Sequence, residues 1–181
     1  MTKEMKAIIP YAGIPIIALA LLLVRMKQTA PLVLLWLVLI IVFGYVGAIL
    51  DIKTKRIPNG LVLTMFAAWV VTITPYLFLE TEAAVELLMD SVLGFAFGGG
   101  LFLFVYLISR KGLGGGDVKF MAAAGMYLGF SGAIPTMLYG TILAGLTGLV
   151  LILLKRIGRK DTMPLAPFLY AGILIVVFFQ Q

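Results

Sequence analysis

The sequence predicts an all-α polytopic membrane protein, a bundle of about seven transmembrane helices. Hydrophobic residues make up 62% of its 181 residues and charged residues only 12%, whereas about 25% of the residues in an average soluble domain are charged. The mean hydropathy is +1.15. Apolar stretches close to the ~20 residues that a membrane-spanning helix needs recur along the whole chain. We therefore expect one helical bundle and no separate soluble module.

Seven apolar stretches are the candidate helices: residues 8–24, 31–50, 61–79, 91–109, 118–130, 133–154 and 165–179. The first is short and contains Pro10 and Pro15, so a tilted or re-entrant segment is an alternative. We assign residues 1–30 to an extra N-terminal membrane helix and residues 31–181 to a six-helix core. Small residues spaced four apart let membrane helices approach closely, and such spacing occurs at Gly94 and Gly98, at Gly125 and Gly129, and at Gly140, Ala144 and Gly148. Trp36 and Trp69 are expected at the membrane interface or facing lipid.

The basic residues predict how the protein is oriented in the membrane. Of the 14 Lys and Arg residues, all except Arg25 and Lys27 lie on one side of the seven-span topology. The positive-inside rule assigns that side to the cytoplasm. The opposite side receives residues 80–90, where Glu82, Glu86 and Asp90 repeat every four residues, as in an amphipathic interfacial helix.

The composition excludes several kinds of chemistry. The chain has no cysteine and no histidine, which rules out disulfides, zinc ribbons, H-E-x-x-H metalloproteases and Ser-His or Cys-His dyads. We expect no metal and no cofactor. The net charge of +6 comes from loop residues, whose role in this class is orientation, so it gives no indication of nucleic-acid binding.

Two aspartates are the candidates for chemistry. Of the eight acidic residues, four cluster in the connection 80–90 and two, Glu4 and Asp161, lie in charged ends or loops. Asp51 and Asp117 remain, each beside an apolar stretch, where an ionisable group is costly unless it is used or paired. The topology places both at the cytoplasmic side, although 65 residues separate them in the sequence. Two neighbouring carboxylates share a proton, so one can act as general base toward water and the other as general acid.

The residues around the aspartates suit this chemistry. Three glycines, residues 114–116, precede Asp117 and permit unusual backbone angles and a close approach of substrate. Pro58 presets the start of the next helix. Plain alternatives remain: Asp51 as a solvated residue of a basic loop, and Asp117 as a helix N-cap. An ion-coupled carrier that uses two membrane carboxylates is a further interpretation.

The two motifs resemble those of the type IV prepilin peptidases, a family of G-x-G-D intramembrane aspartyl proteases. Asp51 followed by Ile57, Pro58 and Asn59 matches the pattern D-x5-I-P-N. The pattern G-x-G-D-x-K is matched by Gly114, Gly116, Asp117 and Lys119. A weaker similarity, at the entry to the last helix, is Pro164-x-x-Pro167-Phe168-Leu169. The resemblance covers roughly residues 31–181.

This resemblance implies that Asp51 and Asp117 are the catalytic pair of an aspartic endopeptidase. The implied substrates are type IV pilin-like precursors, whose short basic leader is cut at the cytoplasmic face just before a hydrophobic helix. Longer members carry an N-methyltransferase region with C-x-x-C zinc ligands, which this cysteine-free sequence lacks. We therefore expect the short form of the enzyme that serves tight-adherence (Flp) pili, located in the bacterial inner membrane. A homodimer is compatible with this expectation. An archaeal preflagellin peptidase is the alternative.

Overall fold

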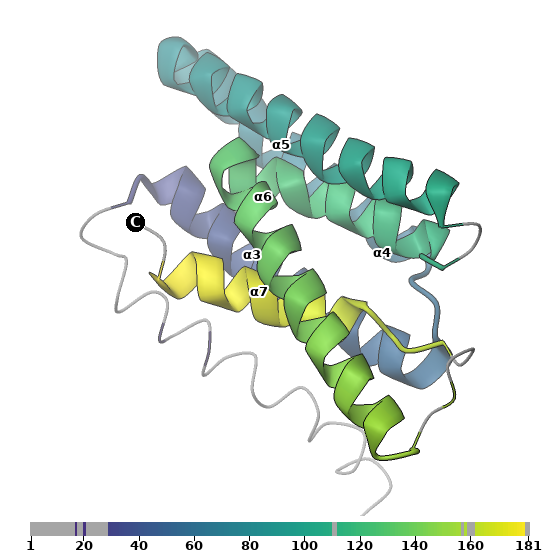
Figure 1. Ribbon diagram of the computed structural model, residues 1–181. Helices are drawn as coiled ribbons and strands as arrows, with labels where there is room; N and C mark the ends of the chain where they lie inside the picture. Colours follow the sequence, from purple (N-terminus) through teal and green to yellow (C-terminus); the bar gives the residue numbers. More distant parts are fainter. Residues whose placement is uncertain are drawn as a thin grey trace, which may run out of the picture.

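The computed structural model describes residues 17, 20, 29–109, 112–156, 158 and 162–179. Within them the secondary structure is entirely helical: α3 (Pro31–Thr54), α4 (Asn59–Leu79), α5 (Thr81–Ile108), α6 (Gly115–Leu153) and α7 (Ala166–Phe179) (Figure 1). Four of these helices are long and apolar enough to cross a membrane, and α7 is a shorter apolar helix of 14 residues. The prediction of an all-α integral membrane protein is confirmed, but the count of seven helices is not. The helix predicted over residues 8–24 lies almost entirely outside the described residues, so it stays a prediction.

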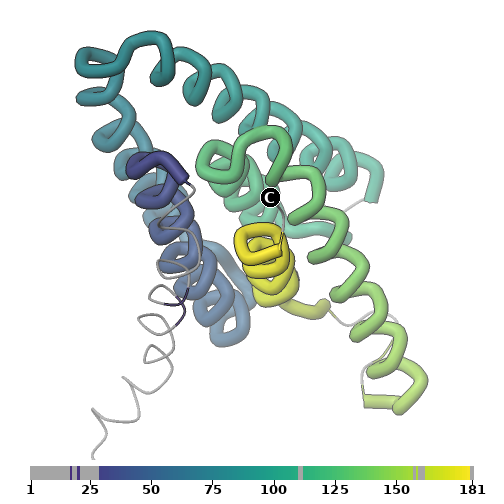
Figure 2. The backbone as a smooth tube through the Cα atoms, turned by 90° about the vertical axis from the view of Figure 1, so that its left-hand side faces the viewer, coloured from purple at the N-terminus to yellow at the C-terminus, as the bar shows by residue number. Residues whose placement is uncertain are grey.

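Helix α6 replaces two of the predicted helices, those over residues 118–130 and 133–154. It is 39 residues long and is broken at Gly129, whose φ of 67° and ψ of −178° are not helical. The chain turns there, so the two halves of α6 run in opposite directions along the bundle (Figures 1 and 2). Figure 2 shows α7 between α3 and the second half of α6. From residue 31 onward the helices therefore alternate in direction as expected, but the break at Gly129 replaces the loop predicted between residues 118–130 and 133–154.

The sequence predicted a separate interfacial helix over the acidic segment 80–90, and this is wrong. Helix α5 continues without interruption from Thr81 to Ile108. Asp90 is half-buried in this helix, and its Oδ1 accepts a hydrogen bond of 2.9 Å from the backbone N–H of Phe130. That amide is the first one after the break in α6, where the helix cannot supply an acceptor of its own. Asp90 therefore stabilises the start of the second half of α6, as a capping carboxylate does.

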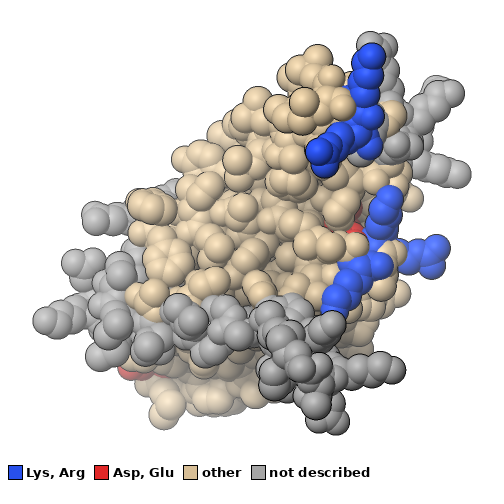
Figure 3. Space-filling view, turned by 90° about the horizontal axis from the view of Figure 1, so that it is seen from below, with Lys and Arg blue, Asp and Glu red and all other residues tan. Residues whose placement is uncertain are grey.

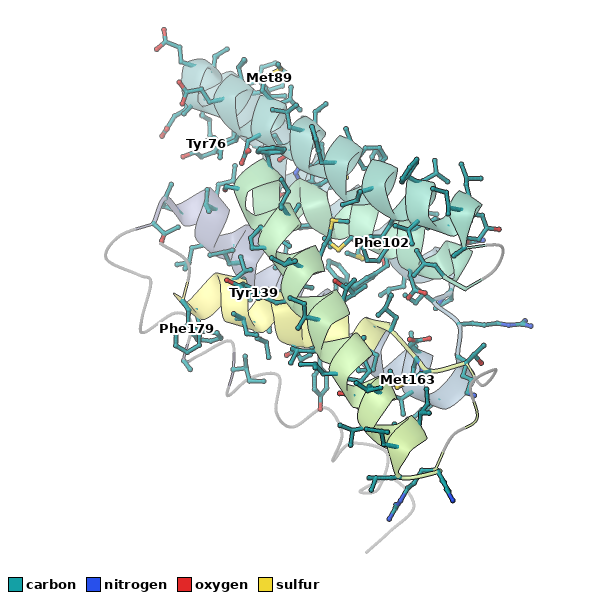
Figure 4. The ribbon with its side chains drawn as sticks, viewed as in Figure 1. Tyr76, Met89, Phe102, Tyr139, Met163 and Phe179 are labelled. Atoms are coloured by element: carbon teal, nitrogen blue, oxygen red, sulfur yellow. The ribbon has the colours of Figure 1, made fainter. Side chains whose placement is uncertain are left out.

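The predicted glycine contacts hold α5 against the first half of α6. A Cβ atom at Gly94 would collide with the backbone of Gly125 and Gly129, and one at Gly98 would lie 2.9 Å from the carbonyl oxygen of Met121. Backbones can approach this closely only where side chains are absent, and such contacts replace the hydrophobic driving force that lipid removes. Phe102, one helical turn further along α5, is buried at 3% exposure and points into the bundle (Figure 4).

The expectation that both tryptophans lie at the interface or face lipid is wrong. Trp36 is 2% exposed and Trp69 is 7% exposed, and their ring centroids are 5.9 Å apart between α3 and α4. The indole N–H of Trp36 donates a hydrogen bond of 2.9 Å to the hydroxyl of Thr72. Because this polar atom finds a partner on the neighbouring helix, the ring can be placed in the core.

Replacing Gly129 by alanine is expected to lower the thermal unfolding midpoint in detergent by several degrees, because a side chain there adopts a strained backbone conformation, at about 1–3 kcal/mol, and meets the Asp90 carboxylate. Gly145→Ala is the control, since a Cβ atom at Gly145 has no neighbour within 4 Å. Equal midpoints for the two variants would contradict this account of the break.

Candidate active site

The structure brings Asp51 and Asp117 together at one end of the bundle. Asp51 lies in the last turn of α3 and Asp117 in the first turn of α6. Both line a cavity of about 290 Å³ and an adjoining cleft of about 750 Å³. In Figure 3, acidic atoms are visible in a hollow between Lys and Arg side chains. The basic residues described near the helix termini here, which we call the basic end, are Lys53, Lys55, Arg56, Lys119, Lys155 and Arg156.

Asp51 is almost completely enclosed. Only 5% of its surface is exposed, and its Oδ2 accepts a hydrogen bond of 3.0 Å from the backbone N–H of Ala166, the first residue of α7. A buried carboxylate is costly unless such a donor compensates for the lost water. Asp51 is therefore not the solvated loop residue of the plain alternative. This contact was not predicted from the sequence.

Asp117 lines the same cavity as Asp51. Its Oδ1 is buried and has no hydrogen-bond partner among the described residues, while its Oδ2 lies against Gly114. The N-cap of α6 is Gly114, so Asp117 does not occupy the N-cap position that the plain alternative gave it. A buried oxygen without a protein partner is available to a water molecule or a substrate group.

The I-P-N segment, which follows Asp51, contacts the segment that contains Asp117. Pro58 is the N-cap of α4 with φ −69° and ψ 142°, and it places Ile57 before the helix and Asn59 at its first position. Ile57 is 8% exposed and packs against the glycine loop, since a Cβ atom at Gly116 would lie 3.2 Å from the Cβ of Ile57. Asn59 Oδ1 accepts a hydrogen bond of 3.0 Å from Lys119 Nζ. The two sequence motifs therefore interlock through both a backbone contact and a side-chain pair.

The glycines are needed for space and not for unusual backbone angles, which corrects the expectation from the sequence. Gly114 has φ −78° and ψ 138°, an extended conformation open to any residue, and the only glycine of positive φ among the described residues is Gly129. A Cβ atom at Gly114 would lie 2.8 Å from Asp117 Oδ2, whereas one at Gly115 would be 3.9 Å from its nearest neighbour, Tyr106. Gly114 thus leaves room for the aspartate, and Gly115 faces an ordinary contact.

Two features of the site were not found from the sequence. Lys55 and Arg56 line the cavity beside Asp51, although both read as orientation signals in a loop. The segment before α7, residues 162–165, lines the larger cleft, and its distance from Asp51 in the sequence hid this role. No group of three or more Asp, Glu, His or Cys side chains that could hold a metal occurs in the part of the chain that the structure describes; the absence of a metal stays a prediction.

The position of the aspartates also bears on the carrier interpretation. Coupling-ion sites of carriers usually lie near the middle of the bilayer, at broken helices. The break in α6 is at Gly129, at the other end of that helix half from Asp117. Both aspartates instead lie within one turn of a helix end. This arrangement suits a site that a peptide reaches from one side of the membrane.

Comparison with known proteins identifies the family. The profile described as the Type IV leader peptidase family matches residues 32–153, a range that contains both aspartate motifs. Three similar curated proteins are each named "Prepilin leader peptidase/N-methyltransferase". The protein from Pectobacterium carotovorum is 35% identical over 149 residues, 76% of this chain and 49% of its own length. The protein from Burkholderia pseudomallei strain K96243 is 30% identical over 143 residues, 76% of this chain and 45% of its own.

The protein from Bacillus subtilis is 28% identical over 138 residues, 73% of this chain and 50% of its own. The chain thus spans about half the length of these relatives. A search of solved structures finds no significant match. Because the family profile covers more than half of the chain and both of its aspartate motifs, the chain belongs to the Type IV leader peptidase family.

Proposed function

We propose that the protein is a membrane-embedded aspartic endopeptidase that removes the short basic leader of type IV pilin-like precursors. The observation that carries this proposal is that Asp51 and Asp117, from motifs far apart in the sequence, line the same cavity. The names of the related proteins, all prepilin leader peptidases, support the substrate class.

The geometry suits hydrolysis by two carboxylates and one water. One carboxylate accepts a proton from the water, whose oxygen then bonds to the carbon of the scissile peptide carbonyl. The other carboxylate donates its proton to the leaving nitrogen as the C–N bond breaks, so the products are a free carboxyl group and a free amine. The hydrogen bond from Ala166 to Asp51 Oδ2 fixes one carboxylate, and the unpartnered Oδ1 of Asp117 gives the other a position for water or substrate.

The finer assignments are part of the same proposal. We assign the protein to the short peptidases of Flp-type pili, in the inner membrane with the active site facing the cytoplasm. Support for this orientation comes from the basic end, which holds the aspartates. Glu80 and Glu82 lie away from it, where α4 ends and α5 begins. The bacterial prepilin peptidases among the relatives favour this assignment over an archaeal preflagellin peptidase. A homodimer stays a prediction.

The two aspartates are expected to act as a unit. Asp51→Asn and Asp117→Asn should each abolish cleavage of a pilin-like precursor from the same genome by the purified protein in detergent. The double variant should lose nothing further, because residues of one catalytic unit are not additive. EDTA should leave the activity unchanged, since the mechanism needs no metal.

The matched control is Asp90→Asn, which changes a membrane carboxylate that caps α6 outside the cavity; it should retain cleavage. Substantial activity in either single variant, or an EDTA inhibition that zinc or calcium reverses, would contradict the proposal.

The orientation can be tested separately, because the chain contains no cysteine. Single cysteines at Thr54, Gly112 and Gly158 should be protected from an impermeant thiol reagent in intact cells and should react after the membrane is opened, since the basic end faces the cytoplasm. A cysteine at Thr81 should react from outside. Labelling of Thr54→Cys and Gly112→Cys on opposite sides would place about 30 Å of hydrocarbon between the two aspartates and would exclude a shared site.

A further inference from the structure

The non-helical residues 162–165, which we call the connecting segment, are tied to the end of α3 at two points. At one end of the segment, Lys55 Nζ donates a hydrogen bond of 3.1 Å to the carbonyl oxygen of Thr162. Just beyond its other end, Ala166 N–H donates to Asp51 Oδ2 at 3.0 Å. The stretch between these bonds is therefore fixed relative to one of the two aspartates.

Lys55 makes its bond from an unusual position. It is the C-cap of α3 in the left-handed conformation, with φ 51° and ψ 33°, and its N–H donates to Asp51 O at 2.7 Å. Glycine is the usual residue at such a cap, and a side chain there costs about 1–2 kcal/mol. At Lys55 this position aims an ammonium group across to the connecting segment. Lys155, at the end of α6, has a similar φ of 54° but lines neither cavity.

The connecting segment forms one wall of the larger cleft. Met163, Pro164 and Leu165 line it together with Val105 of α5 and Ala144 of α6. Figure 4 shows Met163 of the connecting segment beside the second half of α6. Thr141 and Ala144, which lie one helical turn apart on α6, also line the cleft.

The two cavities that meet at the aspartates differ in chemistry. The smaller one carries Arg56 and Lys119 in addition to Lys55. The larger one has Lys55 as its only basic lining residue among those described, and side chains of Val, Leu, Met, Pro and Ala make up much of its wall. An apolar stretch of polypeptide is therefore better accommodated in the larger cleft, since burying it there removes apolar surface without stranding charges.

Resting on the proposed function, we propose that the larger cleft binds the apolar residues that follow the scissile bond, and that Lys55 is a positioning residue which fixes the connecting segment as the wall of this cleft. Lys55 acts through Thr162 and not on the reacting atoms. The side chains of the cleft then determine which substrates fit beside the catalytic pair.

The position of the wall can be measured without any substrate. Met163→Cys introduces a single thiol into the connecting segment of a cysteine-free chain, and its rate of reaction with a maleimide in detergent reports how firmly the segment is held. Lys55→Met, which keeps most of the length of the side chain but removes the donor, should raise this rate several-fold. Lys55→Arg, which can still donate, should restore the slow rate. Lys155→Met is the matched control and should leave the rate unchanged.

The same variants, with Met163 retained, are then compared in cleavage of a pilin-like precursor from the same genome. Lys55→Met should raise KM by about tenfold with kcat within about twofold, as expected when a hydrogen bond to a charged group that shapes the binding site is lost. Lys55→Arg should restore KM, and Lys155→Met should be unaffected. Ala144→Leu should also raise KM by filling the cleft, whereas Gly145→Leu, at a position with no neighbour within 4 Å, should not.

Two results would overturn this inference. An unchanged thiol reaction rate in Lys55→Met, whatever its kinetics, would show that Lys55 does not hold the segment. Equal KM values for Ala144→Leu and the wild type would show that the cleft does not bind the substrate. Failure of the proposed function is distinguishable from both, because the wild-type protein would then cleave no precursor while the thiol reaction still reported on Lys55.

Discussion

The enclosure of Asp51 is the constraint on which the basic end of the bundle depends. A carboxylate with 5% exposure at the end of an apolar helix has lost most of its water and needs donors from the protein. The backbone N–H of Ala166 is such a donor, which requires the chain to return to α3 just where α7 begins. Ile57 lines the same cavity as Asp51, and Gly116 leaves room for it, since a Cβ atom at Gly116 would lie 3.2 Å from the Cβ of Ile57.

Two carboxylates of this protein meet the cost of a membrane environment in different ways. Asp90 is satisfied by a backbone amide at the break in α6, so its charge is used to stabilise the turn between two antiparallel helix halves. Asp117 keeps a buried oxygen that no described residue bonds, beside a cavity that it shares with Asp51. An unmet bond in a buried carboxylate costs free energy. At Asp117 this cost arises at a place where a water molecule or a peptide can supply the missing hydrogen bond.

Much of the fold and of the candidate site was accessible from the sequence, since span length, charge asymmetry and glycine spacing are local signals. They located the apolar helices from residue 31 onward, close helix packing at Gly94 and Gly98, and the convergence of the two aspartates. Features that depend on partners distant in the sequence were misread. Asp90 read as part of an interfacial helix because its partner, Phe130, lies 40 residues away. Trp36 read as an interface or lipid-facing residue because the sequence does not show that Thr72 accepts its N–H.

The two motif segments pack against each other beside the aspartates, and a disulfide can test this packing directly. In the cysteine-free chain, Ile57→Cys and Gly116→Cys would place two Cβ atoms 3.2 Å apart, so a shift of a few tenths of an ångström brings them to the ~3.5–4.5 Å that a disulfide spans. Mild oxidation of the purified double variant should form an intramolecular disulfide, detected as protection of both thiols from maleimide. The pair Ile57→Cys and Gly145→Cys should not form one. Two free thiols in the first pair after oxidation would contradict the convergence of Asp51 and Asp117.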